Sequence, residues 1–121
     1  MRNLLGNWTR RAWLATWLQD RRRARLAATG LPGAPQNLNG TDTGSLIQLD
    51  WSPGTGTVTG LRVYRRVAAG ADVLYAVLGA SAVTYQDSGV SFGQSYTYTV
   101  AAYNTVGESA RSNSYLTVFG A

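Results

Sequence analysis

The sequence predicts a mainly β protein of short antiparallel strands, preceded by an N-terminal α-helical arm. Residues 95–104 alternate apolar and polar side chains with the period of two that is typical of a half-buried strand. The 121 residues include 14 glycines and only 14% are charged, which favours strands and turns over a helical bundle. Up to Gly30 there are seven arginines and one acid, whereas from Leu31 there are four arginines and five acids. We therefore expect a basic arm joined to a nearly neutral domain.

The arm is expected to span residues 1–30. From Asn7 to Ala28 there is no proline or glycine, and alanine, leucine and arginine dominate, which favours a helix. Asn7 or Thr9 is a candidate for the cap at the start of this helix, Gly30 is a candidate for the cap at its end, and Pro32 would stop any continuation.

The arm also holds the candidate contact residues of the chain. Apolar groups reach nearly all round the predicted helix, and three tryptophans within ten positions indicate a surface buried against other protein subunits. The predicted partner-binding residues are Trp8, Trp13, Leu14, Trp17 and Leu18. The arginines predicted to contact an acidic partner or nucleic acid are Arg10, Arg11, Arg21, Arg22, Arg23 and Arg25. A membrane surface is the less favoured partner, because it predicts a helix with two cleaner faces.

No signal peptide or transmembrane span is expected in this arm. The apolar run 12–18 is only seven residues long, and Asp20 with four arginines follows it where a cleavage site would need small residues. A transmembrane helix needs roughly 20 apolar residues.

A linker over residues 31–35 and a β domain over residues 35–121 are expected to follow. Two prolines and a glycine in the linker forbid helix. Alternating patterns separated by glycine-rich and proline-containing turns predict the strands. Their expected ranges are 46–52, 60–66, 73–78, 82–86, 95–104 and 113–119, and a first strand is expected to start within residues 35–38.

Four stretches of this domain resemble the fibronectin type III family. They are the Pro-x-Asn-Leu opening at residues 35–38, Trp51 followed by Ser-Pro, the Gly-Leu-Arg-Val-Tyr-Arg run from Gly60, and the strand around Tyr96. The resemblance implies a seven-stranded antiparallel sandwich, with Trp51 in the core and Tyr96 at the tyrosine corner, its hydroxyl bonded to upstream backbone. Residues 104–111 lack Arg-Gly-Asp, so the integrin contact of some family members does not carry over.

The sequence offers no set of residues for catalysis, metal binding or a cofactor. It has no cysteine and no histidine, so the usual general base and the commonest metal ligands are missing. Asp87, which precedes Ser-Gly, is expected to cap its own turn. Tyr64, Tyr75, Tyr103 and Tyr115 are the candidates for an exposed recognition surface, dispersed rather than in one row. We expect a protein that is not an enzyme and has no small-molecule substrate.

An anchoring helix joined to one such module is similar to virion proteins of tailed bacteriophages, including head decoration, neck and tail proteins. The resemblance implies a structural or accessory subunit of a large assembly, located in the virion. The alternative is a bacterial surface or secreted module that binds glycans or proteins, and a third interpretation is a module anchored at a membrane surface. A cytoplasmic location also stays open.

Overall fold

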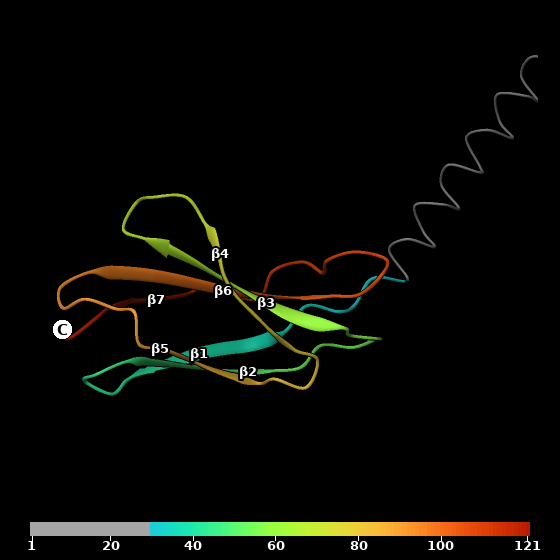
Figure 1. Cartoon of the computed structure of the whole chain (residues 1–121), viewed down its shortest axis with the longest axis horizontal. Coiled ribbons are helices and arrows are strands. Elements are labelled where there is room, and N and C mark those ends of the chain that lie inside the picture. The colour runs from blue at the N-terminus through green and yellow to red at the C-terminus, as the bar shows by residue number, and fades with distance from the viewer. Residues whose placement is uncertain (1–29) are drawn as a thin grey trace, which may run out of the picture. The chain divides into compact units, whose positions relative to one another are not determined.

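The computed structural model describes residues 30–121, which form a sandwich of two antiparallel β-sheets (Figure 1). The predicted helical arm lies outside the described residues. The strands are β1 (Gln36–Asp42), β2 (Ile47–Ser52), β3 (Gly60–Val67), β4 (Val73–Gly79), β5 (Thr84–Asp87), β6 (Ser95–Tyr103) and β7 (Tyr115–Val118). The prediction of seven strands in a mainly β sandwich is confirmed.

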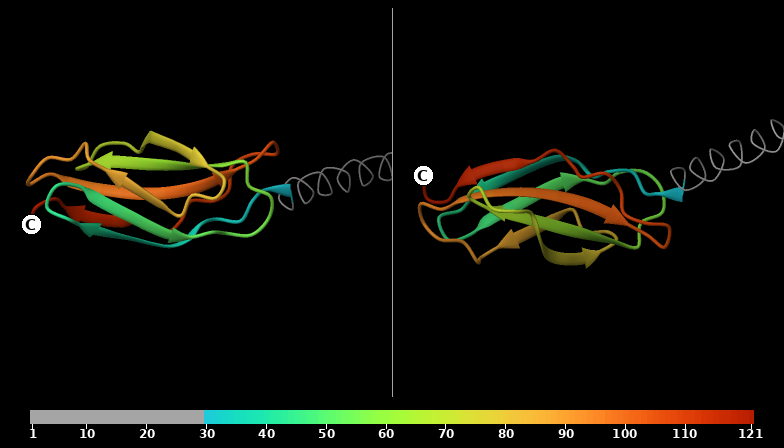
Figure 2. Two further views of the ribbon diagram at one scale, coloured as in Figure 1. Left: turned by 60° about the horizontal axis from the view of Figure 1, so that its bottom comes forward. Right: turned by 90° about the horizontal axis from the view of Figure 1, so that it is seen from above.

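One sheet has the strand order β1-β2-β5 and the other has the order β4-β3-β6-β7. All paired strands are antiparallel, and the longest pairing joins β3 to β6 from Gly60 and Tyr103 to Val67 and Tyr96. The two sheets lie face to face, with the first described residues and the C-terminus at opposite ends of the sandwich (Figure 2).

The core forms where the alternating apolar residues of both sheets meet. In β2, Ile47 and Leu49 are fully buried, whereas Asp50, which lies between Leu49 and the buried Trp51, is exposed. In β3 and β6, Val63 and Val100 pair across the sheet and are also fully buried. The alternation expected from the sequence thus places one side of each strand against the opposite sheet.

Two strands, β5 and β7, start two residues later than predicted. β5 begins at Thr84 rather than Ala82, since the Ala82 N–H donates to the Gly79 carbonyl in a turn. β7 begins at Tyr115 rather than Asn113. The expected ranges for these two strands were therefore wrong at their N-terminal ends.

Asn113 instead joins the two sheets through its side-chain amide. Its Oδ1 accepts a hydrogen bond from the Leu38 N–H at 2.9 Å, and its Nδ2 donates to the Leu38 carbonyl at 2.9 Å. One side chain thereby satisfies both backbone groups of a residue on the outer strand β1.

The residues predicted as a linker pack against the domain. Pro32 and Pro35 are buried, and the Gly33 N–H donates to the Thr55 carbonyl at 2.7 Å. A side chain at Gly54 would collide with the Gly33 and Ala34 carbonyls, so this close approach depends on a glycine.

Candidate functional site

The structure describes the predicted core residues and the candidate residues of the β domain, but not those of the arm. The arm positions lie outside the described residues: Trp8, Trp13, Leu14, Trp17, Leu18, Arg10, Arg11, Arg21, Arg22, Arg23 and Arg25. Their roles remain predictions.

Trp51 and Tyr96 both lie in the core. Trp51 is 6% exposed, and its Nε1–H donates to the Ala82 carbonyl at 3.1 Å, so its polar edge has a partner despite burial. Tyr96 is 3% exposed, and its hydroxyl accepts the Ser91 N–H at 2.8 Å. This hydrogen bond holds the loop between β5 and β6 against β6.

A buried carboxylate, Asp87, links the two sheets. It ends β5 and is fully buried. From the opposite sheet, Tyr98 donates a hydrogen bond to Oδ2 at 2.6 Å, Arg65 donates to Oδ2 at 3.0 Å and Tyr75 donates to Oδ1 at 2.8 Å. The Gly89 N–H donates to Oδ1 at 3.0 Å, which is the predicted turn cap. The carboxylate therefore has four donors and a paired charge.

The ionisation of this cluster follows from burial and hydrogen bonding together. Burial alone would raise the pKa of Asp87. The hydrogen bonds from Tyr98, Tyr75 and Arg65 together lower this pKa by more than burial raises it, so the net pKa lies below the usual value. Burial and the hydrogen bond to the anionic Asp87 raise the pKa of Tyr75 to about 12. The same two causes raise the pKa of Tyr98. The cluster thus holds an ionised carboxylate between neutral phenols at neutral pH.

A second network covers the outer side of the sheet β4-β3-β6-β7. We call it the outer ladder, and its members are Arg62, Tyr64, Arg66, Asp72, Tyr103, Glu108 and Arg111. Tyr64 lies at its centre: its hydroxyl donates to Glu108 Oε1, and the Arg111 guanidinium lies 3.4 Å from the centre of its ring. An arginine so close to a ring face makes a cation–π contact.

The two ends of the outer ladder are held by longer ion pairs. Arg62 Nη1 lies 3.8 Å from Glu108 Oε2, and the Arg62 guanidinium lies 4.2 Å from the Tyr103 ring centre. At the other end, Asp72 lies between two arginines, 3.5 Å from Arg66 Nε and 3.6 Å from Arg111 Nη1. Positive and negative groups therefore alternate along β3.

Two serines place Glu108 and Arg111 over the sheet. The Ser109 N–H donates to the Ala102 carbonyl while its hydroxyl accepts the Ala102 N–H, and Ser112 does the same with Val100. The segment between β6 and β7 therefore runs beside β6 without forming a regular ladder of backbone pairs. The residues next to these serines reach across the face of β6 to β3.

The four tyrosines that were predicted to form an exposed surface lie in different environments of the domain. All four are half-buried, so the expectation of exposure was wrong. Tyr64 and Tyr103 belong to the outer ladder, whereas Tyr75 donates to Asp87 and Tyr115 packs against the core. Their aromatic rings are partly covered because arginines stack on three of them, Tyr64, Tyr75 and Tyr103.

Sequence reasoning missed the role of Arg65 and the full role of Asp87. Arg65 follows Leu61 and Val63 at a spacing of two, so strand alternation places its side chain toward the core. An inward arginine requires a buried acid, and this requirement could have distinguished Asp87 from a simple turn cap. No sequence pattern could predict that Arg111 stacks on Tyr64, because the two residues are 47 positions apart in the chain.

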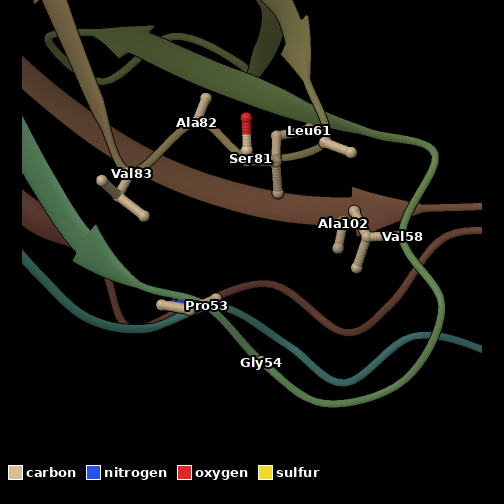
Figure 3. A pocket seen from close by; sticks show the side chains of 9 residues that line it. Pro53, Gly54, Val58, Leu61, Ser81, Ala82, Val83 and Ala102 are labelled. Carbon is tan, nitrogen blue, oxygen red and sulfur yellow. The ribbon is translucent and has the colours of Figure 1, made fainter.

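Two small cavities lie in the described part of the chain. One, of about 260 Å³, is lined by apolar groups of the loop after β2, of β3 and of the turn before β5 (Figure 3). Pro53, Val58, Leu61 and Ala82 are among its walls, and the Ser81 hydroxyl is the one polar side-chain group among the nine residues that line it. The other, of about 220 Å³, lies against Arg65 and Tyr75. Neither cavity is lined by a nucleophile with a base beside it.

The part of the chain that the structure describes has no group of three or more acidic, histidine or cysteine side chains that could hold a metal ion. Within residues 30–121 there is also no helix that is long and apolar enough to cross a membrane.

The β domain is similar to known proteins. Residues 33–118 match the family described as "Fibronectin type III domain". No curated protein matches the sequence.

Solved structures share the fold of the domain. The Fn3-like protein from Clostridium thermocellum has a TM-score of 0.61 and 24% identity, covering 74% of this chain and 95% of that chain. The sixth type III domain of human fibronectin type III domain containing protein 3 has a TM-score of 0.62 and 21% identity, covering 73% and 85%. The twitchin kinase region from C. elegans has a TM-score of 0.62 and 21% identity over 73% of this chain. This chain spans only 16% of the twitchin chain.

Proposed function

Because the chain belongs to the fibronectin type III family, we propose that it is a non-enzymatic structural and accessory subunit of a larger protein assembly. Fibronectin type III domains are structural and protein-interaction modules, and the domain itself is not catalytic. The kinase named in one matched chain belongs to that chain, of which this sequence spans 16%.

The observation that carries the proposal is the concentration of arginine and tryptophan in the arm. Residues 1–30 hold seven of the 11 arginines and three of the four tryptophans. Tryptophan and arginine are the residues most enriched among those that dominate binding energy at protein interfaces. In this proposal the arm anchors the chain among neighbouring subunits, and the type III domain projects from the anchor.

The finer form of the proposal is a virion protein of a tailed bacteriophage, in the head, neck or tail. It rests on the similarity of design, one module joined to an anchoring arm, and on no measured partner. The arm's arginines would face acidic protein surfaces or packaged nucleic acid in such a particle.

The glycan-binding alternative is less well supported by the geometry of the domain. Sugar rings bind by stacking on free aromatic faces, but arginines already lie over the rings of Tyr64 and Tyr103 at 3.4 and 4.2 Å. A sugar would have to displace Arg111 or Arg62 from its ring. A membrane-surface anchor requires the same arm and differs from the main proposal only in the partner.

The test is the association state of the full chain, measured by light scattering at low and high salt, with and without DNA. We expect a defined oligomer that dissociates when Trp13 and Trp17 are both replaced by alanine. The matched control replaces Thr9 and Thr16 by alanine in the same segment and should leave the oligomer unchanged. A full chain that is monomeric under every condition, like its tryptophan variant, would contradict self-association through the arm. A shift that needs DNA and disappears in salt would assign the arm to nucleic acid.

A further inference from the structure

The arginines of the outer ladder are held by stacking and by ion pairs: Arg62 and Arg111 lie over tyrosine rings, and Arg66 pairs with Asp72. A guanidinium carries five N–H donors. Among residues 30–121, the one side-chain hydrogen bond that Arg62, Arg66 and Arg111 donate goes from Arg111 to Thr99 at 3.2 Å. Their ion pairs are 3.5 to 3.8 Å long, and their side chains are 34–42% exposed. These are oriented cations with capacity for further carboxylate oxygens.

Charge is distributed unevenly between the two sheets of the sandwich. The outer ladder contains three of the four arginines of the domain and two carboxylates. The strands β1, β2 and β5 contain three aspartates and no arginine. The domain as a whole has more acids than bases, so the outer ladder is a local positive surface that complements an acidic partner.

Exposed apolar residues lie on both sides of this positive surface. On β4, Leu74 pairs with Tyr64 and Val77 pairs with Arg62, so both lie on the outer side of the sheet. On β7, Leu116 pairs with Thr97, which in turn pairs with Arg66. The exposed fractions of Leu74, Val77 and Leu116 are 48%, 56% and 66%. A charged centre between apolar margins is suited to a segment that carries both carboxylates and apolar side chains.

We infer that the outer ladder is a binding surface for an acidic, partly apolar segment of a partner protein. The carboxylates of that segment pair with Arg66, Arg111 and Arg62, and its apolar side chains cover Leu74, Val77 and Leu116. A nucleic acid fits less well, because Asp72 and Glu108 stand between the arginines and repel a continuous row of phosphates. This inference concerns the domain and is independent of the anchoring role proposed for the arm.

The test follows backbone amide chemical shifts of the ¹⁵N-labelled full chain at low ionic strength. The probe is the peptide acetyl-Leu-Glu-Leu-Glu-Leu-amide, and its matched control has glutamine in place of both glutamates. We expect saturable shifts at the amides of the outer ladder, β4 and β7 with the acidic peptide, and much weaker ones with the glutamine peptide. The double variant Arg66→Gln and Arg111→Gln should weaken this binding at least about tenfold. The control Asp50→Asn, on the other sheet, should bind as the unmodified chain does.

Residue-specific shifts separate this inference from the proposal for the arm. Shifts confined to residues 1–30 would overturn the outer ladder as a binding surface and leave the arm as the acidic-partner site. Equal binding of the two peptides would also overturn the inference, because it would remove the role of the carboxylates. A single-stranded oligodeoxynucleotide that saturates the same ladder amides more tightly would reassign the surface to nucleic acid. Spectra of the free variants that match the unmodified chain away from the substitutions will show that the fold is intact.

Discussion

The Tyr98 hydroxyl donates a 2.6 Å hydrogen bond to the carboxylate of Asp87, and this bond connects the two sheets of the sandwich. Tyr98 lies on β6 of the four-stranded sheet, whereas Asp87 ends β5 of the three-stranded sheet. Both residues are fully buried. A polar connection thus lies within the apolar packing between the sheets, and it also holds the charge of Arg65.

Replacing Asp87 by alanine should destabilise the domain strongly. The change leaves the guanidinium of Arg65 without its counter-charge and removes the acceptor of three side-chain donors. Breaking a buried pair in this way costs about 3–5 kcal/mol. Urea unfolding followed by tryptophan fluorescence gives the free energy. Asp50→Ala on the exposed face of β2 is the control and should stay within about 0.5 kcal/mol of the unmodified chain. Equal effects of the two changes would show that the cluster has no special role.

The stability of the domain should fall in acid because of Asp87. Its pKa is lower in the folded protein than in the unfolded chain, where the usual value is about 3.9. As the pH drops below about 4, the unfolded chain takes up this proton first, and proton uptake favours unfolding. The stabilisation is therefore complete above that pH and disappears as the pH falls through the folded pKa. Asp87→Asn should be less stable than the unmodified chain at pH 6, and the gap should narrow between pH 4 and pH 2. A gap that stays constant across this range would contradict the assignment.

Tyr96→Phe should cost about 1–3 kcal/mol of unfolding free energy. The change removes the acceptor of the Ser91 N–H and leaves that donor without its partner. Tyr103→Phe is the matched control, because the Tyr103 hydroxyl makes no hydrogen bond in the described part of the chain. Thermal and urea unfolding should show that Tyr96→Phe lowers the free energy of unfolding by more than Tyr103→Phe does, and that the difference exceeds the experimental error. If both changes cost the same, the hydroxyl of Tyr96 contributes nothing specific.

Gly40→Ala should destabilise the domain by about 1–3 kcal/mol through steric overlap. A Cβ at Gly40 would overlap the ring of Tyr115, which reaches across from the other sheet. Gly79→Ala is the control, because a Cβ there meets nothing within 4 Å. Replacing Tyr115 by alanine in the Gly40→Ala background should cost less than it does alone, which urea unfolding of the four proteins in the cycle would measure. Strict additivity would contradict the contact.

The sequence was informative where structure depends on local pattern. The sequence located all seven strands, and the alternation of Ile47, Leu49 and Trp51 with Gln48 and Asp50 placed Trp51 in the core. The starts of β5 and β7 were less predictable, because Ala82 forms a turn with Gly79 before β5 and Asn113 bonds to Leu38 of the other sheet before β7.

The two networks of the domain show what local pattern cannot provide. Asp87 meets Arg65, Tyr75 and Tyr98 from three strands of the other sheet, and such partners are brought together only by the packing of the sheets. The outer ladder likewise joins β3 to a segment more than 40 residues later. Strand alternation alone places Arg62, Tyr64 and Arg66 on the outer face of β3, but it contains no information about which residues lie over that face.

The amide of Asn113 also affects how the molecule meets other strands. β1 is an outer strand of its sheet, and an outer strand offers free N–H and carbonyl groups to any extended chain that approaches. At Leu38 both groups are already occupied by Asn113, so an incoming chain would have to displace this side chain before it could pair. Edge-to-edge pairing of β1 at Leu38 therefore has to compete with the two hydrogen bonds of Asn113.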